Sequence, residues 1–565
     1  MSNVPRISHL RPFCRVAVVA AAALFSAPAF AATFTVDAFD EAVAGYDGNC
    51  ATDCTLRDAI ALSNANGVDD TIIVPSGSPD IILVIAGTGE DANATGDHDI
   101  WDTAAGTTLT IQLNGTRVAN QSGASDRIFH TLPTGGGVHA VTLIVEDGEV
   151  LSGEVIDAPG GCVLAEEAPI ELDGVTFSQC HADWSAAATI GGGAVAALGG
   201  ATITDSAFSN NRATLADGGA LYVLGDLSVT QSTFADNAVV GATGRGGSVR
   251  WLGSSQTANL TDVVVERSAS PTNGGGLSLS DTAGIVRLTR VDLDENETGG
   301  NGANLFSDVD DLAAEELIAT EGAAANRGGG WYMIPGTGAT GQYGQGGTPI
   351  CDRCAFTGNE AGTEGGGVAI HVRAGAPSGT FIFRNTTIGE NVSGTATGGT
   401  NPGAGLWLAA GAVGGSGSSF PAVTALLQHS SVVNNDSAGA PDKDLHVQSS
   451  SLTIAMENSI VDGPCEATIP PPGIYVSLGG NVLWTQVGAQ NCPVTVTDTN
   501  PAGSGASVFT LGPATLITSP TPHYDNADAP ASIDFVTCPS AVAVDQLSTV
   551  RPTTPGTCDS GSIEQ

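Results

Sequence analysis

Basic residues are scarce in this chain. Its 565 residues include 18 lysines and arginines against 59 aspartates and glutamates, a formal net charge of −41, and Lys443 is the only lysine. Binding to a phosphate backbone needs a basic surface, so the composition argues against a nucleic-acid partner. Charge of one sign keeps chains apart in solution. Bound Ca²⁺ is the one cofactor that such a surface suggests, and no other is expected.

Long apolar runs are also missing, except at the N-terminus. Arg6, Arg11 and Arg15 precede a short apolar run over Val16 to Phe25, and the small-x-small site Ala29-Phe30-Ala31 follows it. This order is typical of a secretory signal peptide that is cleaved near Ala31. A membrane anchor is the alternative, but the run is shorter than the ~20 residues that a span needs. We therefore expect a protein that is secreted or held at the bacterial cell surface, without a transmembrane segment.

Cysteine is infrequent, and its count becomes even once the signal peptide is removed. Cys14 precedes the apolar run, which leaves ten of the eleven cysteines, as expected for an oxidising compartment. We expect each to pair with a near neighbour in sequence, although sequence alone does not establish the connectivity. The expected pairs are Cys50–Cys54, Cys162–Cys180, Cys351–Cys354, Cys465–Cys492 and Cys538–Cys558.

Aromatic residues make up only 5% of the chain and glycine is abundant, at 76 residues. This composition is compatible with disorder, but a repeat argues for a folded solenoid. A glycine pair or triplet followed by an apolar strand alternates with an apolar-x-x-Asn motif, at first with a period of about 26 to 28 residues. The glycine motif occurs at 192, 218, 246, 274, 328, 365 and 403, and the second motif ends in Asn211, Asn237, Asn296, Asn359, Asn391 and Asn435.

The three residues after each glycine motif alternate in character. The first and third are nearly all apolar, as in Leu221 and Val223, whereas the middle one is mixed. Such a period of two indicates a strand with one buried face. The sequence thus predicts an all-β fold, a right-handed single-stranded parallel β-helix. We expect Asn at the corners because it tolerates left-handed backbone angles and its side chains can bond from coil to coil.

The middle positions should form one outward line if the coils stack in register. Aromatic and arginine side chains on a rigid face suit stacking against sugar rings, and the alternative is that they stack on one another for stability. The candidate ligand-binding residues on this line are Tyr222, Arg250, Phe306, Tyr332 and Trp407.

Both ends of a solenoid need a cap. Thr55-Leu56-Arg57-Asp58 is a capping box that opens an amphipathic helix to about Asn66, and Asp70 to Pro75 then starts the first strand. The expected organisation is a signal peptide at 1–31, an N-terminal cap with a disulfide and a helix at 32–75, β-helix repeats at 76–475, and a disulfide-containing C-terminal cap at 476–565.

The region Cys54-Thr55-Leu56-Arg57-Asp58-Ala59-Ile60, followed by Asn64-Ala65-Asn66-Gly67, resembles the CSLREA-type domain of bacterial secreted β-helix proteins. Thr55 and Asp58 replace the usual Ser and Glu. The tail, with Val544-Asp545-Gln546 and Cys558-Asp559-Ser560-Gly561, is similar to the module that often accompanies that domain, although Leu547-Ser548 replaces its usual Arg-Gly. The repeats also resemble those of polymorphic outer-membrane adhesins. These resemblances imply export and the β-helix, but little chemistry.

Many pectate-lyase-like β-helices are polysaccharide lyases or hydrolases, but fold alone is only an analogy. The strongest charged cluster here is Arg287, Arg290, Asp292, Asp294 and Glu295. Its candidate catalytic residues are Arg287, Arg290, Asp292 and Asp294, whose two carboxylates could bind a cation or act as an acid/base pair. A solvated ion-pair face is the alternative. Lys443 lies in a loop-like segment that suits a solvated charge better than a catalytic base.

The remaining motifs favour structure over chemistry. Cys351 and Cys354 fall on the strand repeat rather than at the start of a helix, which favours a structural disulfide over a redox or zinc site. The nine histidines show no metal-ligand spacing. We therefore expect a non-catalytic secreted or surface β-helix that binds a polysaccharide or extracellular matrix, as an adhesin does. A secreted polysaccharide lyase or glycoside hydrolase is the alternative, and a structural surface component is a third.

Overall fold

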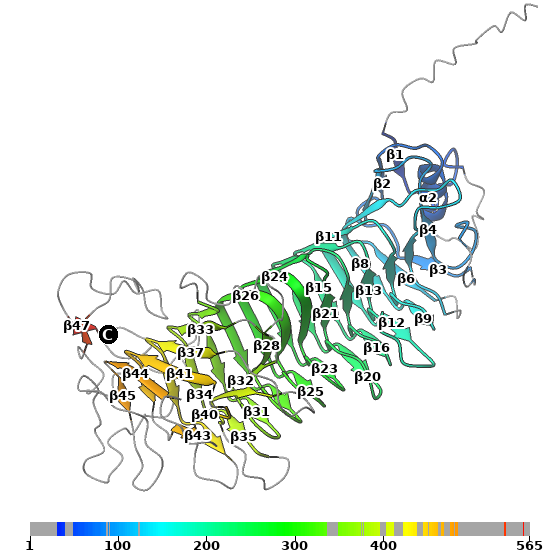
Figure 1. The fold of residues 1–565 in the computed structure, drawn as a ribbon. Coiled ribbons are helices and arrows are strands. Elements are labelled where there is room, and N and C mark those ends of the chain that lie inside the picture. The colour runs from blue at the N-terminus through cyan, green and yellow to red at the C-terminus, as the bar shows by residue number, and fades with distance from the viewer. Residues whose placement is uncertain are drawn as a thin grey trace, which may run out of the picture.

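The computed structural model describes residues 31–39, 49–85, 87, 89, 91–121, 125–335, 349–373, 376, 378–395, 403–411, 422–437, 444–449, 451–461, 465–467, 475–479, 481–483, 536–537 and 557–558. Within these residues almost every element is a strand that pairs in parallel with the corresponding strand one coil away. Figure 1 shows the strands stacked side by side along an elongated body. The predicted parallel β-helix is confirmed. Residues 1–30 of the predicted signal peptide and Lys443 lie outside the described residues.

Four ladders of parallel strands run along the axis. The first ladder follows the glycine turns and begins with β4 (His98–Ile100), β7 (Phe129–Thr131), β10 (Val163–Ala165), β13 (Val195–Ala197), β17 (Leu221–Val223) and β21 (Val249–Leu252). It continues through the first residues of two long strands, β24 (Leu277–Asp294) and β26 (Leu305–Thr320). It ends with β28 (Trp331–Pro335), β32 (Val368–Val372), β36 (Leu406–Ala410), β40 (Leu445–Val447) and β43 (Cys465–Ala467).

The second and third ladders share the long strands β8 (Thr142–Leu151), β11 (Ile170–Ser178), β22 (Thr257–Glu266), β24 and β26. The second also contains β1 (Thr33–Thr35), β2 (Asp70–Ile73), β5 (Thr108–Gln112), β14 (Ala201–Thr204), β18 (Leu227–Thr230), β29 (Cys351–Asp352), β33 (Gly379–Arg384), β37 (Val423–Gln428), β41 (Leu452–Glu457) and β44 (Tyr475–Gly479). The third also contains β3 (Ile81–Leu83), β6 (Arg117–Asn120), β15 (Ala207–Ser209), β19 (Thr233–Ala235), β30 (Ala355–Thr357), β34 (Thr387–Gly389), β38 (Ser431–Val433), β42 (Ile460–Val461) and β45 (Val482–Leu483).

The fourth ladder is a separate sheet of short strands. It consists of β9 (Glu154–Ile156), β12 (His181–Asp183), β16 (Arg212–Thr214), β20 (Ala238–Val240), β23 (Ala269–Ser270), β25 (Glu297–Thr298), β27 (Ala323–Ala324), β31 (Glu360–Ala361), β35 (Val392–Ser393) and β39 (Asp436–Ser437). Near the C-terminus, β46 (Val536–Thr537) pairs antiparallel with β47 (Thr557–Cys558).

The core fills the inside of the coil. The first and third residues of each first-ladder strand point inward, and Leu221 and Val223 are fully buried there, as the period of two predicts. In the third ladder Phe177, Phe208 and Phe234 stack on one another, with ring centroids 5.1 and 4.7 Å apart. Parallel register places like residues above one another, so stacked aromatic rings form a continuous apolar column.

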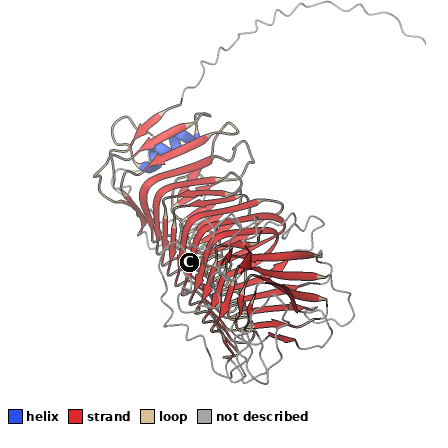
Figure 2. Cartoon of the chain, turned by 90° about the vertical axis from the view of Figure 1, so that its left-hand side faces the viewer, coloured by secondary structure: helices blue, strands red, loops and turns tan. Residues whose placement is uncertain are grey.

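The N-terminal cap is built around α2 (Leu56–Asn64), which lies at one end of the strand stack (Figure 2). Thr55 Oγ1 accepts the backbone N–H of Asp58 at 3.1 Å, and Asp58 accepts the N–H of Thr55 at 3.3 Å, which confirms the capping box. The predicted first strand, Asp70–Pro75, is not the first. The strand β1 precedes the helix in sequence and pairs in parallel with β2, which follows the helix. Within the described residues, no helix has the length and apolar character needed to cross a bilayer.

The corner asparagines bond from coil to coil as predicted, but their backbone role is not the predicted one. Asn237 and Asn391 are fully buried, and the left-handed residue is the one before each of them: Asp236 at φ 57° and Glu390 at φ 57°. The role of each corner asparagine is therefore to form hydrogen bonds through its side-chain amide. Asn391 Nδ2 donates to the carbonyl of Phe356 at 2.9 Å and to Asn435 Oδ1 at 2.9 Å.

Between Asn211 and Asn435, two coils have no asparagine at this corner, and neighbouring side chains close the gaps. At Ser268 the chain of hydrogen bonds passes from Asn237 to Ser248 at 3.1 Å and on to Ser268 at 2.7 Å. At Gly322 it passes through Asn304, which accepts from Asn296 at 2.8 Å and donates to Asn359 at 3.0 Å. The buried polar line thus continues where the sequence motif is interrupted.

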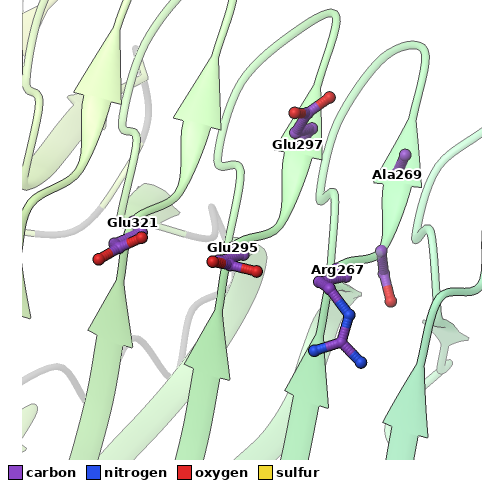
Figure 3. Close-up of a pocket in the computed structure, with 6 residues that line it drawn as sticks. Arg267, Ala269, Glu295, Glu297 and Glu321 are labelled. Atoms are coloured by element: carbon purple, nitrogen blue, oxygen red, sulfur yellow. The ribbon is translucent and has the colours of Figure 1, made fainter.

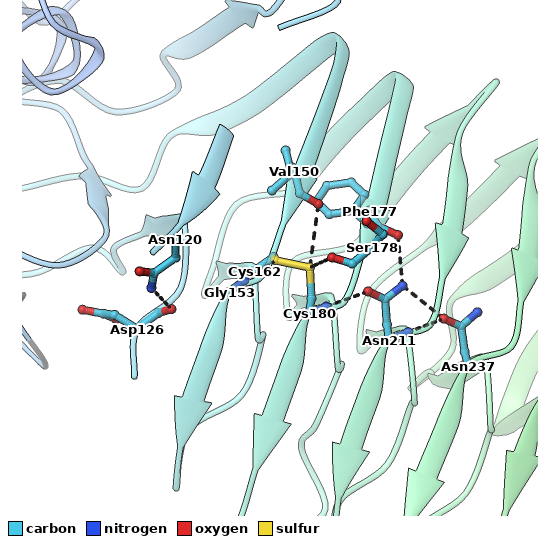
Figure 4. The surroundings of a disulfide bond; sticks show 10 residues. All are labelled: Asn120, Asp126, Val150, Gly153, Cys162, Phe177, Ser178, Cys180, Asn211 and Asn237. Atoms are coloured by element: carbon cyan, nitrogen blue, oxygen red, sulfur yellow. Dashed lines mark hydrogen bonds between the residues drawn. A yellow bond between two sulfur atoms is a disulfide. The ribbon is translucent and has the colours of Figure 1, made fainter. Parts of the chain in front are cut away.

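The disulfide Cys162–Cys180 adjoins the start of this line (Figure 4). Cys180 occupies the asparagine corner position, and its N–H donates to Asn211 Oδ1 at 3.0 Å. Cys50–Cys54 and Cys351–Cys354 are also bonded, so three predicted pairs are confirmed. Disulfides of this kind are typical of an oxidising environment. Cys465 is disulfide-bonded, while Cys492 and Cys538 lie outside the described residues and Cys558 is described only as part of β47.

Cys351 and Cys354 are both fully buried on either side of a strand corner, where Arg353 takes a φ of 55°. This location agrees with the predicted structural disulfide. A redox-active pair would need an accessible thiol near a helix N-terminus.

Candidate functional site

The four candidate catalytic residues on β24 do not converge. Arg287 makes two hydrogen bonds to Asp311 in the next coil, at 2.8 and 3.1 Å. Arg290 is a left-handed corner residue that pairs with Asp262, the corner residue of the preceding coil, at 2.5 and 2.8 Å. Both arginines are thus neutralised by carboxylates outside the candidate set.

The two candidate carboxylates lie near each other on the outer face of β24. Burial raises the pKa of Asp292, and the charge of Asp294 adds to the effect. Asp294 accepts a hydrogen bond from the Thr320 hydroxyl at 2.5 Å. The arrangement around β24 is a set of ion pairs between coils, which matches the structural alternative.

The middle positions of the first ladder do stack in register. Tyr222 pairs with Arg250, Arg250 with Ser278, Ser278 with Phe306, and Phe306 with Tyr332. We call this line the outer column. It continues at one end through Ala369 and Trp407 to His446. At the other end it continues through Ala196, Leu164 and His130 to Asp99.

The prediction that the outer column is exposed is wrong. Tyr222, Arg250, Phe306, Tyr332 and Trp407 are only 1%, 2%, 4%, 3% and 2% exposed, respectively. Part of the cover is the glycine turn before each strand, because a Cβ at Gly328 would meet the Cβ of Tyr332 at 2.8 Å. Sugar rings cannot stack on faces that the protein itself covers.

Arg250 is held inside the outer column. Its Nε donates to Asp217 at 3.2 Å, and its Nη1 donates to the hydroxyls of Ser278 and Ser280 at 3.0 and 2.8 Å. Burial raises the pKa of Asp217, while Arg250 acts to lower it. A buried charge in this state needs all of these partners, so Arg250 is a structural residue.

The aromatic cluster, which we define as Phe306, Tyr332, His371 and Trp407, combines three side chains of the outer column with His371, which lies two residues after Ala369 on β32. Phe306 and Tyr332 stack with centroids 5.9 Å apart, and His371 meets Trp407 edge-on at 6.1 Å. The Tyr332 hydroxyl lies 2.8 Å from His371 Nδ1. Trp407 Nε1 is buried without a hydrogen-bond partner.

Two arginine–carboxylate pairs border the aromatic cluster. Arg327 lies over the Trp407 ring, 5.2 Å from its centroid, and donates to Glu364 at 2.7 Å. Arg373 donates to both oxygens of Asp308 at 3.0 and 3.2 Å. The arginine side chains are 36% and 44% exposed, so the cluster reaches solvent through them.

The first coils contain a cluster that the sequence analysis missed, the carboxylate–histidine cluster of Asp91, Asp97, Asp99, His130 and Glu166. Asp99 on β4 and His130 on β7 are register partners. His130 Nε2 lies 2.8 Å from Glu166 Oε1, and Nδ1 lies 3.4 Å from Asp99 Oδ1 and 4.0 Å from Asp97 Oδ2. Asp99 and Asp97 are almost completely buried.

Proton affinities in this cluster are strongly shifted. Burial raises the pKa of Asp97 to about 7, although Arg127 acts in the opposite direction. Burial tends to lower the pKa of His130, but the carboxylates of Asp99 and Glu166 outweigh it and raise the pKa to about 9. Perturbed groups of this kind concentrate at functional sites, although structural networks produce them too. The triplets at 98–100 (His-Asp-Ile) and 129–131 (Phe-His-Thr) lack the apolar-x-apolar pattern of the later coils, and no glycine triplet precedes them, so the repeat gave no signal for this cluster.

An acidic surface pocket of about 430 Å³ lies at the corner before the fourth ladder (Figure 3). Glu295, Glu297 and Glu321 line it beside Arg267, whose guanidinium is bound to Asp236 and Glu266. Among the described residues, none forms an ion pair with these three glutamates. The pocket is therefore a site of uncompensated negative charge, and the possible Ca²⁺ stays a prediction.

No protein-family model, curated protein or solved structure matches this chain.

Proposed function

We propose that this chain is an exported, non-catalytic β-helix that binds a glycan of the extracellular matrix or cell surface. Support for export comes from the signal-peptide pattern, the disulfides and the resemblance to CSLREA-type secreted proteins. Support for binding comes from one region of the β-helix, the border of the aromatic cluster where Arg327 and Arg373 reach solvent. The covered faces of Tyr222 and Arg250 are not part of the proposal.

The observation that carries the proposal is the position of Arg327. Its guanidinium lies over Trp407, is bound to Glu364, and remains 36% exposed. The pair offers a fixed donor and a fixed acceptor beside an aromatic ring, as sugar hydroxyls require. The Arg373–Asp308 pair repeats the same chemistry on the other side of the ladder.

Binding can be tested without disturbing the core. Arg327→Met keeps the unbranched stem but removes the charge, and Arg373→Gln removes the second donor. The matched control is Arg287→Gln, which removes an arginine–aspartate pair on another ladder. Loss of a charge-assisted hydrogen bond of ~1.5–3 kcal/mol predicts at least about tenfold weaker binding for the first two variants.

The measurement is co-sedimentation with a panel of neutral and acidic polysaccharides. Equal binding by wild type and all three variants would place the glycan site elsewhere. Binding to no polysaccharide would leave a structural surface protein as the better account.

A polysaccharide lyase is the second candidate, and the Tyr332–His371 hydrogen bond favours it. Elimination from a uronate needs a base and a positive group near the carboxylate. His371 would become the base once Nδ1 releases the Tyr332 hydroxyl, and Arg327 would be the positive group. Burial raises the pKa of Tyr332, so its hydroxyl stays protonated. Unsaturated chain ends that form with wild type but not with His371→Gln would replace the binding proposal with this one.

A further inference from the structure

The carboxylate–histidine cluster has the composition and spacing of a metal site. One ligand atom each from Asp91, Asp99 and His130 lies within 4.8 Å of the other two. We propose that these three side chains bind a transition-metal dication of the zinc class in the first coils of the β-helix. This inference is independent of the proposed glycan binding.

His130 is oriented as a metal-ligating histidine usually is. Such a histidine donates its second ring N–H to a carboxylate or carbonyl, which fixes the ring. Here Nε2 lies 2.8 Å from Glu166 Oε1, which leaves Nδ1 facing Asp99. Glu166 is thus the orienting carboxylate.

The observed spacing fits tetrahedral coordination. Metal–ligand bonds of 2.0–2.1 Å place neighbouring ligand atoms of a tetrahedron roughly 3.3 Å apart. His130 Nδ1 and Asp99 Oδ1 are 3.4 Å apart. Asp91 belongs to the loop before β4, and its exposed carboxylate can close the remaining distance by a side-chain rotation.

An unsatisfied buried atom independently points to a ligand. Asp99 is 0% exposed. Its Oδ2 accepts the backbone N–H of Asn93 at 3.0 Å, whereas its Oδ1 makes no hydrogen bond and only faces His130 Nδ1 at 3.4 Å. Leaving a buried carboxylate oxygen without a donor is costly, and a cation between Asp99, His130 and Asp91 would satisfy it.

The loop that contains Asp91 is held in place from the capping helix. Arg57 on α2 is 1% exposed and donates to the carbonyls of Gly96 and Asp97 at 2.6 and 2.7 Å and to Asn93 Oδ1 at 3.2 Å. A metal bound by Asp91, Asp99 and His130 would join this loop to the second coil and strengthen the N-terminal cap.

The donor set selects the class of metal. Imidazole nitrogen with carboxylate oxygens suits Zn²⁺ and similar transition metals. Ca²⁺ prefers six to eight oxygen ligands, and this cluster does not supply them. Asp97 is not counted as a ligand because its Oδ2 is engaged by Arg127 at 3.3 Å. The fourth position is open to water.

The test is titration of chelator-treated mature protein with Zn²⁺ alone, followed by calorimetry and thermal unfolding. We expect one Zn²⁺ per chain, a higher unfolding temperature, and no equivalent response to Ca²⁺. His130→Gln and Asp99→Asn should abolish binding, and Glu166→Gln should weaken it about 10- to 100-fold. Co²⁺ should give the visible spectrum of a tetrahedral site.

Asp91→Asn keeps the test decisive if a buried variant fails to fold, because Asp91 is exposed and its replacement leaves the core intact. The matched control is His181→Gln on β12, which should bind Zn²⁺ as wild type does. The inference is overturned if folded wild type takes up no Zn²⁺. It is also overturned if folded Asp91→Asn binds as tightly as the control.

Discussion

At the scale of single residues, His371 shows how burial determines a protonation state. The carbonyl of Gly411 can only accept, so His371 Nε2 donates to it at 3.2 Å. Nδ1 then accepts from the Tyr332 hydroxyl. This pair of directions belongs to the neutral ring, in which Nε2 carries the proton and Nδ1 is the acceptor. Burial lowers the pKa of His371, and the charge of Arg327 acts in the same direction.

This predicts a component of stability that is lost in acid. Because the folded pKa lies below the unfolded value of about 6.5, the unfolded chain binds a proton first as the pH falls. The contribution of His371 is therefore complete above about pH 6.5 and declines below it, by about 1.4 kcal/mol for each unit of pKa depression.

Thermal unfolding of wild type and His371→Gln at pH 8 and pH 5 measures this contribution. The loss of unfolding temperature on acidification should be smaller in His371→Gln. Asn259→Ala is the control, because Asn259 is exposed and does not titrate, so this variant should keep the wild-type dependence. Parallel behaviour of wild type and His371→Gln would show that His371 does not contribute.

At the scale of elements, the corner hydrogen-bond line determines how coils join. Asn359 is fully buried, donates to the carbonyl of Ala319 at 2.8 Å and to Asn391 Oδ1 at 3.0 Å, and accepts the N–H of Gly322 at 2.9 Å. Its Oδ1 also accepts from Asn304 Nδ2 at 3.0 Å, the side chain that continues the line where Gly322 has none.

We predict that Asn359→Ala lowers the free energy of unfolding by about 2–4 kcal/mol, since several buried groups lose their partners. Asn259→Ala on the exposed face of β22 is the matched control and should stay within about 0.5 kcal/mol of wild type. Urea unfolding followed by circular dichroism gives both values. Equal stability of the two variants would mean that water replaces the Asn359 amide.

The outer column shows the limit of pattern analysis at this scale. Alternation identifies which face a side chain points to, and Tyr332 and Trp407 do point away from the core. Whether that face meets solvent depends on what folds over it. Here glycine turns and the side chains of neighbouring coils cover it. The alternation of residues along a strand does not reveal such a cover.

At the scale of the whole molecule, negative charge dominates. A net charge of −41 implies self-repulsion in the compact state, whereas pairs such as Arg267–Asp236 and Arg287–Asp311 are half-exposed and weak. Salt screens both effects, and the repulsion is the larger one because acids outnumber basic residues about threefold.

We therefore predict that NaCl, raised from low concentration to about 0.3 M, increases the unfolding temperature by a few degrees at pH 7. At pH 4 many carboxylates are protonated, so the same salt step should have a smaller effect. A fall in unfolding temperature with salt at pH 7 would show that the ion pairs outweigh the repulsion. The measurement is differential scanning fluorimetry.

Sequence by itself determined most of the strands, the coil and the N-terminal capping helix of this protein. The features that predicted them are local: a period of two, a recurring glycine turn and the capping box at Thr55. Each reflects a backbone preference or a burial pattern of residues that are close along the chain. Three disulfide pairs followed for the same reason, because each joins cysteines that are close along the chain.

Only the tertiary structure decided what the side chains do. Asp99 and His130 meet because β4 pairs with β7 in the register that places these two residues opposite each other. That register depends on how the turns between the two strands pack. The same packing buried Arg250 in a network with Asp217, paired Arg290 with Asp262, and covered the outer column. Those outcomes depend on distances between coils, which residue types and their spacing do not encode.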